Sequence, residues 1–390
     1  MKNLAGLVLL LFFLFLLPSN AAKAADSSRI RISLLTCSPG EELYSIFGHS
    51  AIRIIDSNSV TDYVYNYGTF NFEDEDFYLK FARGKLLYFV SLERTDDFLY
   101  FYTTTGRGIK EQELNLNAAE KKSIQAALNE NLREENRYYK YDFFLDNCTT
   151  RLRDIIKNQK HPTPAFPFVM PEKTRFRQSI HQYLEKGGKL WSELGIDLVL
   201  GLPTDKIMTA EEQEFLPDNL MRAVDSCKNT SLVVKKNTLY EPPIINEDKN
   251  WLSPMLVFSL FALIAFALSR MKNSIAIVLT KGIDRLLFFS TGLLGFVLLF
   301  MWTMTDHSMT KNNFNLFWAM PINFIACFFT TTNNRFFKSY FLFYSLLLTI
   351  LILSWSFLPQ ELNNALLPIV LLLAYRSYII YKSPASHSKK

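Results

Sequence analysis

The distribution of hydrophobic positions changes near residue 250 of this 390-residue chain. Before that point, short stretches alternate between apolar and polar residues, which is typical of β-strands with one buried face. After that point, apolar residues form long continuous stretches. The alternation predicts strands over 29–37, 49–56, 60–67, 85–93 and 109–116.

Helices are predicted among and after these strands. Acidic residues at 73–76 can start a short helix, and Asn117 with Glu120 forms a capping box that opens another. A further helix is predicted over 148–158. Strands, helices and further strands in this order favour an α+β domain, which we place at 26–227.

The chain begins with the pattern of a secretory signal peptide, predicted at 1–24. Lys2 precedes an apolar run at 4–17, and Ala22-Lys23-Ala24 is a small-x-small cleavage site. An uncleaved anchor is the alternative. In either case the segment that follows is exported.

A polar linker is predicted at 228–250, and a transmembrane domain at 251–390. Each apolar stretch there is close to the roughly 20 residues that a bilayer core requires. Lys and Arg concentrate in alternate loops, which puts those loops in the cytoplasm and the α+β domain on the outer side of the membrane. The spans are expected near 252–269, 286–304, 314–331, 336–358 and 362–380.

Charge separates the two parts as clearly as hydrophobicity does. Residues 1–250 carry a net charge of −3 and residues 251–390 one of +8, so the overall +5 comes from loops of the apolar part. This distribution argues against a nucleic-acid partner. The sequence also has no metal-ligand spacing and no glycine-rich phosphate loop, so no metal and no cofactor is predicted.

The chain has four cysteines, and their positions narrow the choice of candidate catalytic residues. Cys327 lies in a predicted span, whereas Cys37, Cys148 and Cys227 are expected in an oxidising compartment. A Cys37–Cys227 bridge can form, and one thiol is then left over. A leftover thiol and a histidine are a natural pair to test as a nucleophile and its base.

Cys148 stands at the expected start of a helix, after Asp146-Asn147, which are good N-cap residues. The helix dipole and Arg151 would stabilise a thiolate there. His49 begins a predicted strand, and a hairpin folding about Asn58 would put position 67 opposite it. Asn66 and Tyr67 are then its neighbours, and the Asn66 carbonyl can orient the imidazole. Composition alone favours the alternatives, a buried structural cysteine and an ordinary histidine.

Several segments resemble the N-terminal periplasmic domain of the Lnb family, which is associated with lipoprotein N-acylation. They include SLLTCSPGEELYSIFGHSAIRI, YNYGTFNF, FYLKFARGKLLYFVS, EQELNLN and YDFFLDNCTTRLRDII. The later segment TDHSMTKNNFNLFWAMP resembles the family's membrane part. The resemblance covers most of the chain, and it implies a multi-pass protein of a bacterial inner membrane with its α+β domain in the periplasm.

This resemblance implies a permuted papain-like fold, similar to NlpC-type proteins and lecithin:retinol acyltransferases, followed by an all-α bundle of about five transmembrane helices. It implies Cys148 as nucleophile and His49 as base, whereas Asn66 as orienter is our own inference. The expected reaction moves an acyl chain from a membrane phospholipid, through a Cys148 thioester, to the N-terminal amine of diacylated lipoproteins.

Other polar residues are candidates for substrate binding. Arg151 can bind a lipid phosphate, and Tyr67 and Asn147 lie next to the expected catalytic residues. Near the outer membrane surface, interfacial polar residues are site candidates, although a solvated loop is an equal alternative. These interfacial candidates are Asp306, His307 and Asn315.

Three other classes of function compete with acyl transfer. A cell-wall amidase or peptidase of the NlpC type would not need several membrane spans. A membrane-anchored cysteine phospholipase or thioesterase differs only in using water as the acceptor. A binding module without catalysis would have a merely buried Cys148.

Overall fold

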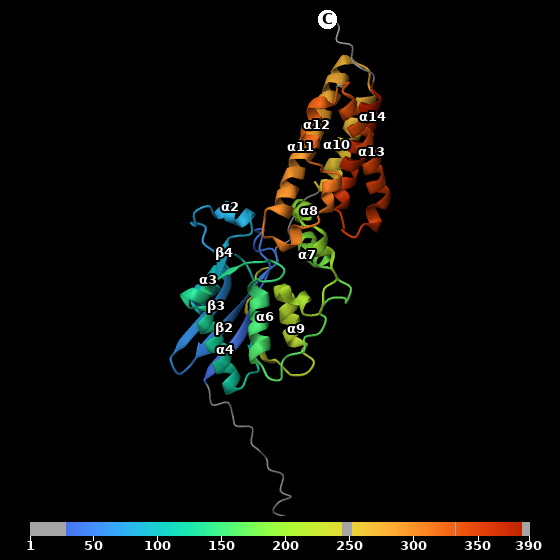
Figure 1. The fold of residues 1–390 in the computed structure, drawn as a ribbon. Helices are drawn as coiled ribbons and strands as arrows, with labels where there is room; N and C mark the ends of the chain where they lie inside the picture. Colours follow the sequence, from blue (N-terminus) through green and yellow to red (C-terminus); the bar gives the residue numbers. More distant parts are fainter. Residues whose placement is uncertain (1–28, 244–251, 332, 384–390) are drawn as a thin grey trace, which may run out of the picture.

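The computed structural model describes residues 29–243, 252–331 and 333–383. The predicted signal peptide, residues 244–250 of the predicted linker and Trp251 lie outside these ranges. Figure 1 shows a part built from a sheet and helices, joined to an elongated bundle of helices. The α+β and all-helical character of the two parts agrees with the sequence pattern.

A seven-stranded sheet forms the centre of the first part, in the order β6-β4-β3-β2-β1-β5-β7. All neighbouring strands run antiparallel. The strands are β1 (Ile30–Cys37), β2 (His49–Asp56), β3 (Thr61–Thr69), β4 (Leu87–Arg94), β5 (Ile109–Leu114), β6 (Tyr138–Lys140) and β7 (Val233–Tyr240).

Helices cover both faces of this sheet, because its strands alternate between two apolar sides. Ile52 and Ile54 belong to the core beneath α6, whereas Ala51 belongs to the core beneath α3. On the first face lie α4 (Ala118–Asn131), α6 (Cys148–Gln159) and α9 (Pro217–Asp225). The other face is covered by α3 (Thr95–Thr104), which the sequence pattern did not predict. Two short helices, α2 (Phe77–Ala82) and α5 (Glu134–Arg137), lie in connections.

The predicted linker at 228–250 contains a strand, which corrects that prediction. β7 pairs with β5 at the edge of the sheet, with Lys235 opposite Glu113. Opposite charges across two strands stabilise their pairing, and lysines protect an exposed edge from further pairing. The polar composition that suggested a linker is therefore that of an edge strand.

The four cysteines are free, so the Cys37–Cys227 bridge that the sequence allowed is not formed. Cys37 is fully buried in the core beneath α3. Cys227 instead packs against the core on the opposite face of the sheet. The sheet itself thus separates the two thiols.

Two helices connect the sheet to the bundle, α7 (Phe176–Lys186) and α8 (Leu190–Val199) (Figure 1). Arg177 on α7 is completely buried and donates to Asp197 over 2.7 Å and to Asp205 over 3.0 Å. Asn363 of the bundle donates to the other Asp197 oxygen over 2.9 Å. The buried charges are thus paired, and α8 is attached to the bundle.

The bundle contains three helices that are long and apolar enough to cross a membrane, among the residues described. They span Ser274–Thr303, Arg335–Phe357 and Asn364–Lys382, and Pro254–Arg270 is a shorter apolar helix. Their α-helical portions are α10 (Pro254–Arg270), α11 (Ser274–Thr303), α13 (Arg335–Ser354) and α14 (Leu367–Lys382).

The expected span near 314–331 is not one continuous helix. It consists of η4 (Phe314–Phe317), α12 (Asn323–Ala326) and η5 (Cys327–Phe329). Pro321 has no backbone N–H to continue a helix. The segment also runs very close to α11, because a Cβ built on Gly292 would lie 2.0 Å from the Phe324 nitrogen. Close backbone packing at glycines thus replaces regular helix here.

α11 begins earlier than the expected span near 286–304, so Arg285 lies on the helix and not in a loop. Asn273 caps the helix, accepting from the Ala276 N–H over 2.7 Å. Two residues before the expected span, Asp284 is buried and pairs with Arg376 of α14 over 2.7 Å. This internal partner lets a charged turn lie inside the bundle.

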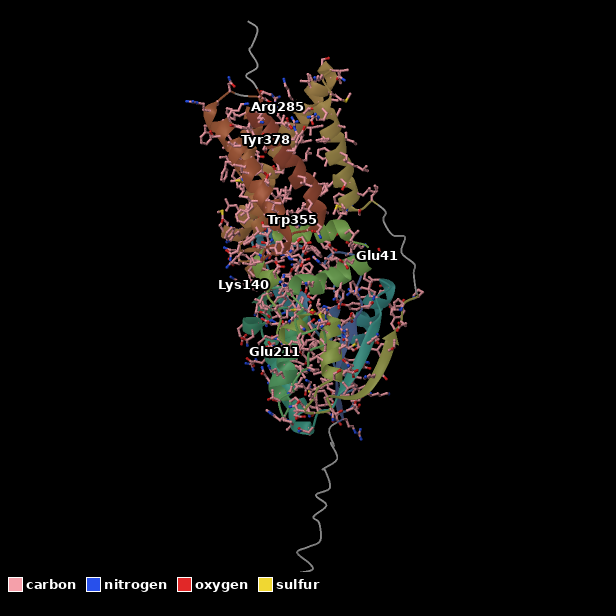
Figure 2. The ribbon with its side chains drawn as sticks, turned by 90° about the vertical axis from the view of Figure 1, so that its right-hand side faces the viewer. Glu41, Lys140, Glu211, Arg285, Trp355 and Tyr378 are labelled. Carbon is pink, nitrogen blue, oxygen red and sulfur yellow. The ribbon has the colours of Figure 1, made fainter. Side chains whose placement is uncertain are left out.

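The loop between α11 and η4, here the 304–313 loop, contacts the periplasmic domain. Figure 2 shows Trp355 at the end of the bundle that faces this domain and Arg285 near the opposite end. The Gly201 N–H donates to the Met309 oxygen over 2.8 Å. The Asp306 N–H donates to the Arg83 oxygen over 2.9 Å. These backbone contacts dock the two parts at the periplasmic end of α11.

Candidate active site

Cys148 is the first residue of α6, as the sequence pattern predicted. Asn147 caps the helix with its side-chain oxygen, which accepts from the N–H groups of Thr149 at 2.8 Å and Thr150 at 2.9 Å. The Cys148 side chain is buried, with 8% of its surface exposed. The cap therefore holds a shielded thiol at a fixed helix start.

The surroundings of Cys148 favour a thiolate. Burial raises the pKa of the thiol, but the charge of His49 and its hydrogen bond with the sulfur outweigh that effect. Hydrogen bonds from the Ser50 N–H and from Thr149 also lower the pKa, and the result is a pKa of about 7. A substantial share of the thiol is thus ionised near neutral pH.

His49 lies at the start of β2 and contacts both other predicted residues. Its Nε2 lies 2.6 Å from the Asn66 side-chain oxygen. Because that oxygen can only accept, Nε2 carries a proton, and Nδ1 is the nitrogen left for the sulfur. Burial lowers the pKa of His49, but the Cys148 sulfur and the Asn66 hydrogen bond raise it above its usual value. The structure thus brings Cys148, His49 and Asn66 together.

The register between β2 and β3 differs by one residue from the expected one. Ile52 lies opposite Tyr65 and Asp56 opposite Thr61, so the hairpin has a four-residue turn. When this register is extended along the strands, position 68 and not position 67 lies opposite His49. Val60 closes this turn with a φ of 54°, a conformation that the sequence pattern did not indicate.

Glu93 completes the site, and the sequence analysis missed it. The Asn66 side-chain nitrogen donates to Glu93 over 2.8 Å, and Ser91 donates to the same carboxylate oxygen over 2.8 Å. An acceptor on the nitrogen side fixes the orientation of the Asn66 amide, so that its oxygen faces His49. Only the pairing of Asn66 with Ser91 across β3 and β4 reveals this neighbour.

A hydrogen bond between side chains joins the two elements that carry the catalytic candidates. The Thr149 hydroxyl donates to the Ser50 hydroxyl over 3.2 Å, and both atoms are buried. These residues follow Cys148 and His49 directly in the chain. The distance between sulfur and imidazole is thus set by contacts at the start of both elements.

Gly68 and Tyr141 form one wall beside the thiol. Gly68 has a φ of +87°, and a Cβ built on it would lie 3.6 Å from the Cys148 Cβ and 4.0 Å from the Tyr141 ring. Only glycine adopts this backbone conformation without strain. Any larger residue at this position would therefore lie directly against Cys148 and Tyr141.

The other predicted residues near Cys148 have partners within the protein. Asn147 donates its two side-chain N–H groups to Phe143 and Phe215, so the cap uses its full hydrogen-bonding capacity. Arg151 pairs with Asp146 over 2.7 Å, which compensates the charge expected to act on the thiol. Tyr67 is a core residue, and its hydroxyl accepts from Asn131 over 2.7 Å. All three help to build the site.

The membrane-part candidates dock the two domains and do not contact the thiol. Asp306 pairs with Lys140 over 3.0 Å, and His307 Nε2 lies 3.1 Å from the Phe81 oxygen. Asn315 is buried and donates to the Asp197 backbone carbonyl over 3.1 Å. These three residues thus lie at the contact between the two domains, where Asn315 is buried and Asp306 stays exposed to solvent.

A separate group of possible metal ligands lies on α7 and α8. Ligand atoms of His181, Glu193 and Asp197 are within 4.8 Å of one another. One Asp197 oxygen already accepts from Arg177 over 2.7 Å and lies 2.9 Å from His181 Nε2. The charge of this carboxylate is therefore balanced by side chains of the protein itself.

The fold and site define a membrane protein with a periplasmic α+β domain that holds a cysteine–histidine–asparagine group. The chain belongs to the Lnb family. Residues 18–170 match the Lnb N-terminal periplasmic domain and residues 246–386 match the Lnb transmembrane domain, which confirms the family expected from the sequence. No curated protein and no solved structure matches the chain. The papain-like fold and the number of spans stay predictions.

Proposed function

We propose that this protein is a lipoprotein N-acyltransferase, which takes an acyl chain from a membrane phospholipid and transfers it to the N-terminal amine of diacylglyceryl lipoproteins. The position of the thiol supports this proposal best. Asp142, shortly before Cys148, accepts from Ser308 of the 304–313 loop over 2.5 Å. The nucleophile's helix thus begins at the end of its domain that faces the bundle (Figure 1).

In the first half-reaction, the sulfur attacks an ester carbonyl of the phospholipid. An S–C bond forms and the ester C–O bond breaks, while His49 passes the thiol proton to the departing glycerol oxygen. A lysophospholipid leaves, and an acyl-thioester stays on Cys148. The Cys148 N–H has no carbonyl one turn before it in α6, so it can donate to the oxyanion.

In the second half-reaction, a neutral lipoprotein amine attacks the thioester carbon. An N–C bond forms, the C–S bond breaks, and His49 carries the amine proton to the sulfur. The products are an N-acylated lipoprotein and the free thiol. A thioester suits this exchange because amines attack it readily. Water in place of the amine would make the protein a phospholipase.

Cys148→Ser tests the proposal in cells whose usual N-acylation step is repressed. Wild type should produce N-acylated lipoproteins, whereas the variant should lower their amount by about 10³-fold or more, because the nucleophile is lost. Mass spectrometry of lipoprotein N-termini measures this. If the wild-type cells contained only free-amine lipoproteins, the transferase assignment would be refuted.

The purified full-length protein separates transfer from hydrolysis. With a phospholipid and a diacylated lipopeptide, we expect N-acyl lipopeptide and lysophospholipid in equal amounts. Free fatty acid without the amide product would identify a phospholipase. Equal activity of Cys148→Ser and wild type would refute Cys148 as the nucleophile.

A further inference from the structure

The segment around α2 exposes an unusual concentration of large apolar side chains. The exposed fractions are 66% for Phe72, 81% for Tyr78, 54% for Leu79 and 53% for Phe81. α2 itself has no buried residue. An isolated exposed apolar residue needs no explanation, but a continuous patch marks a surface that contacts something apolar.

Two contacts place this patch beside the periplasmic end of the bundle. The Arg83 oxygen accepts from the Asp306 N–H over 2.9 Å, and the Phe81 oxygen lies 3.1 Å from His307 Nε2. Asp306 and His307 follow the end of α11 closely. Figure 1 shows α2 at the end of the periplasmic domain nearest the bundle. The patch therefore lies at the level where the outer leaflet of a bilayer around the bundle would end.

A continuous series of aromatic rings leads from this patch to the thiol. Phe77 lies 6.4 Å from Phe81 and 5.9 Å from Phe70, measured between ring centroids. Phe70 lies 5.2 Å from Tyr88, which stacks on Tyr141 at 4.3 Å. Tyr141 and Cys148 both border Gly68, because a Cβ built on Gly68 would lie 4.0 Å from the Tyr141 ring and 3.6 Å from the Cys148 Cβ. We call these five aromatic residues the aromatic path.

Charge favours an acyl chain over an anionic head group as the occupant. Residues 70–85 contain four carboxylates and three cations. One of the cations, Lys80, already pairs with Asp74 over 2.6 Å. No excess of positive charge is left to attract anionic lipid, so the contact must depend on burial of apolar surface.

We propose that the aromatic path and the exposed side chains of α2 bind the acyl chain of the donor phospholipid and guide its ester to Cys148. This inference rests on the proposed acyl transfer. The chain would leave the leaflet at α2, lie against Phe70 and Phe77, and pass Tyr88 and Tyr141. The ester would then lie beside Gly68.

Acyl-thioester formation on the purified full-length enzyme tests this, measured by intact mass. The variant Tyr78→Ser/Phe81→Ser should raise the dipalmitoyl phospholipid concentration needed for half-maximal thioester by about tenfold or more. Its reaction with p-nitrophenyl acetate, which has no long chain, should stay within about twofold of wild type. The matched control is Tyr100→Ser on α3, where the side chain is 71% exposed.

The outcomes separate this inference from the proposed function. If wild type forms no thioester from either compound, the proposed function fails. If wild type reacts with both and the double variant equals Tyr100→Ser, only the aromatic path is refuted. The double variant and wild type should differ by about the same factor in zwitterionic vesicles with and without added anionic lipid. If the two proteins differed only when anionic lipid was present, head-group binding would be favoured instead.

Cross-linking on the wild-type protein gives an independent test that does not depend on a folded variant. A phospholipid with a diazirine on its acyl chain should label residues between 70 and 88 and Tyr141 after illumination. Labelling confined to the helices of the bundle would overturn the proposal.

Discussion

At the scale of single residues, the site depends on a series of hydrogen bonds that starts at the Glu93 carboxylate. Glu93 accepts from the Asn66 amide, and Asn66 accepts from His49. His49 then supplies both a charge and a hydrogen bond to the Cys148 sulfur. Each contact fixes the orientation of the next group, so the buried His49 imidazole keeps its Nε2 proton directed at Asn66 and its Nδ1 directed at the sulfur.

This arrangement predicts the pH dependence of thioester formation. The rate should rise with pH through a midpoint near 7, because the thiolate forms as Cys148 loses its proton. At higher pH the rate should fall as His49 loses its proton, since the leaving oxygen then lacks a donor. Pre-steady-state mass measurements from pH 5 to pH 10, on the order of one point per half unit, would record both limbs. A flat profile across neutral pH would contradict the assignment.

Asn66→Ala should shift the alkaline limb and not only lower the rate. The Asn66 hydrogen bond raises the pKa of His49, so its loss lowers that pKa and moves the falling limb to lower pH. The maximal rate should fall by about 10- to 100-fold, less than for Cys148→Ser, because Asn66 orients and does not react. An unshifted profile would show that Asn66 has a purely structural role.

At the scale of elements, the helix cap decides where the nucleophile stands. The Asn147 side chain makes four hydrogen bonds, two of them to the first turn of α6 and two to the backbone carbonyls of Phe143 and Phe215. A second capping box, formed by Asn117 and Glu120, opens α4. Both caps follow from residue type and spacing, because a short polar side chain before an apolar stripe satisfies the free N–H groups of a helix start.

The two caps provide a matched pair of variants. Asn147→Ala should lower the free energy of unfolding by about 1–3 kcal/mol, since it also removes the side-chain donor to the carbonyls of Phe143 and Phe215. It should slow thioester formation as well, because the start of α6 shifts. Asn117→Ala should lower the free energy of unfolding by about 1 kcal/mol and leave the rate of thioester formation unchanged in the folded protein. Thermal unfolding in detergent and mass measurements give both quantities, and equal effects on the rate would contradict this account.

At the scale of the whole molecule, the docking of the periplasmic domain on the bundle determines what the thiol can reach. Gly201 and Lys311 make one of the closest contacts between the two parts. A Cβ built on Gly201 would lie 1.9 Å from the Lys311 backbone oxygen. Both partners are backbone atoms, so neither can move away easily. The docking also includes the pairing of Lys140 with Asp306 and the bond between Ser308 and Asp142.

Gly201→Ala should therefore separate chemistry from access to the membrane. We expect thioester formation from phospholipid to fall by about tenfold or more, while the reaction with p-nitrophenyl acetate continues, because the Cys148 group is intact and only its position changes. Gly195→Ala on α8 is the control, as no atom lies within 4 Å of its added Cβ. Equal loss with both compounds would instead indicate unfolding of the domain.

Much of this protein follows from the sequence alone, because local patterns have local physical causes. Period-two alternation indicated β1 and β2, the capping residues indicated the starts of α4 and α6, and long apolar runs separated the bundle from the periplasmic domain. The position of Cys148 at a helix start needed no tertiary information. Five segments of the periplasmic domain and one of the membrane part indicated the family, which the matches to both of its domains confirm.

Only the tertiary structure decided what depends on contacts between distant segments. The turn at Val60 shifted the strand register by one residue, and Glu93 reached Asn66 through a strand pairing that no local pattern specifies. Residues 233–240 became a strand because β5 offered an open edge. Residues 314–331 lost regular helix because α11 presents glycines to them. Residue type determines which local structure is favourable, but the free energy of each long-range contact depends on partners that the chain meets only on folding.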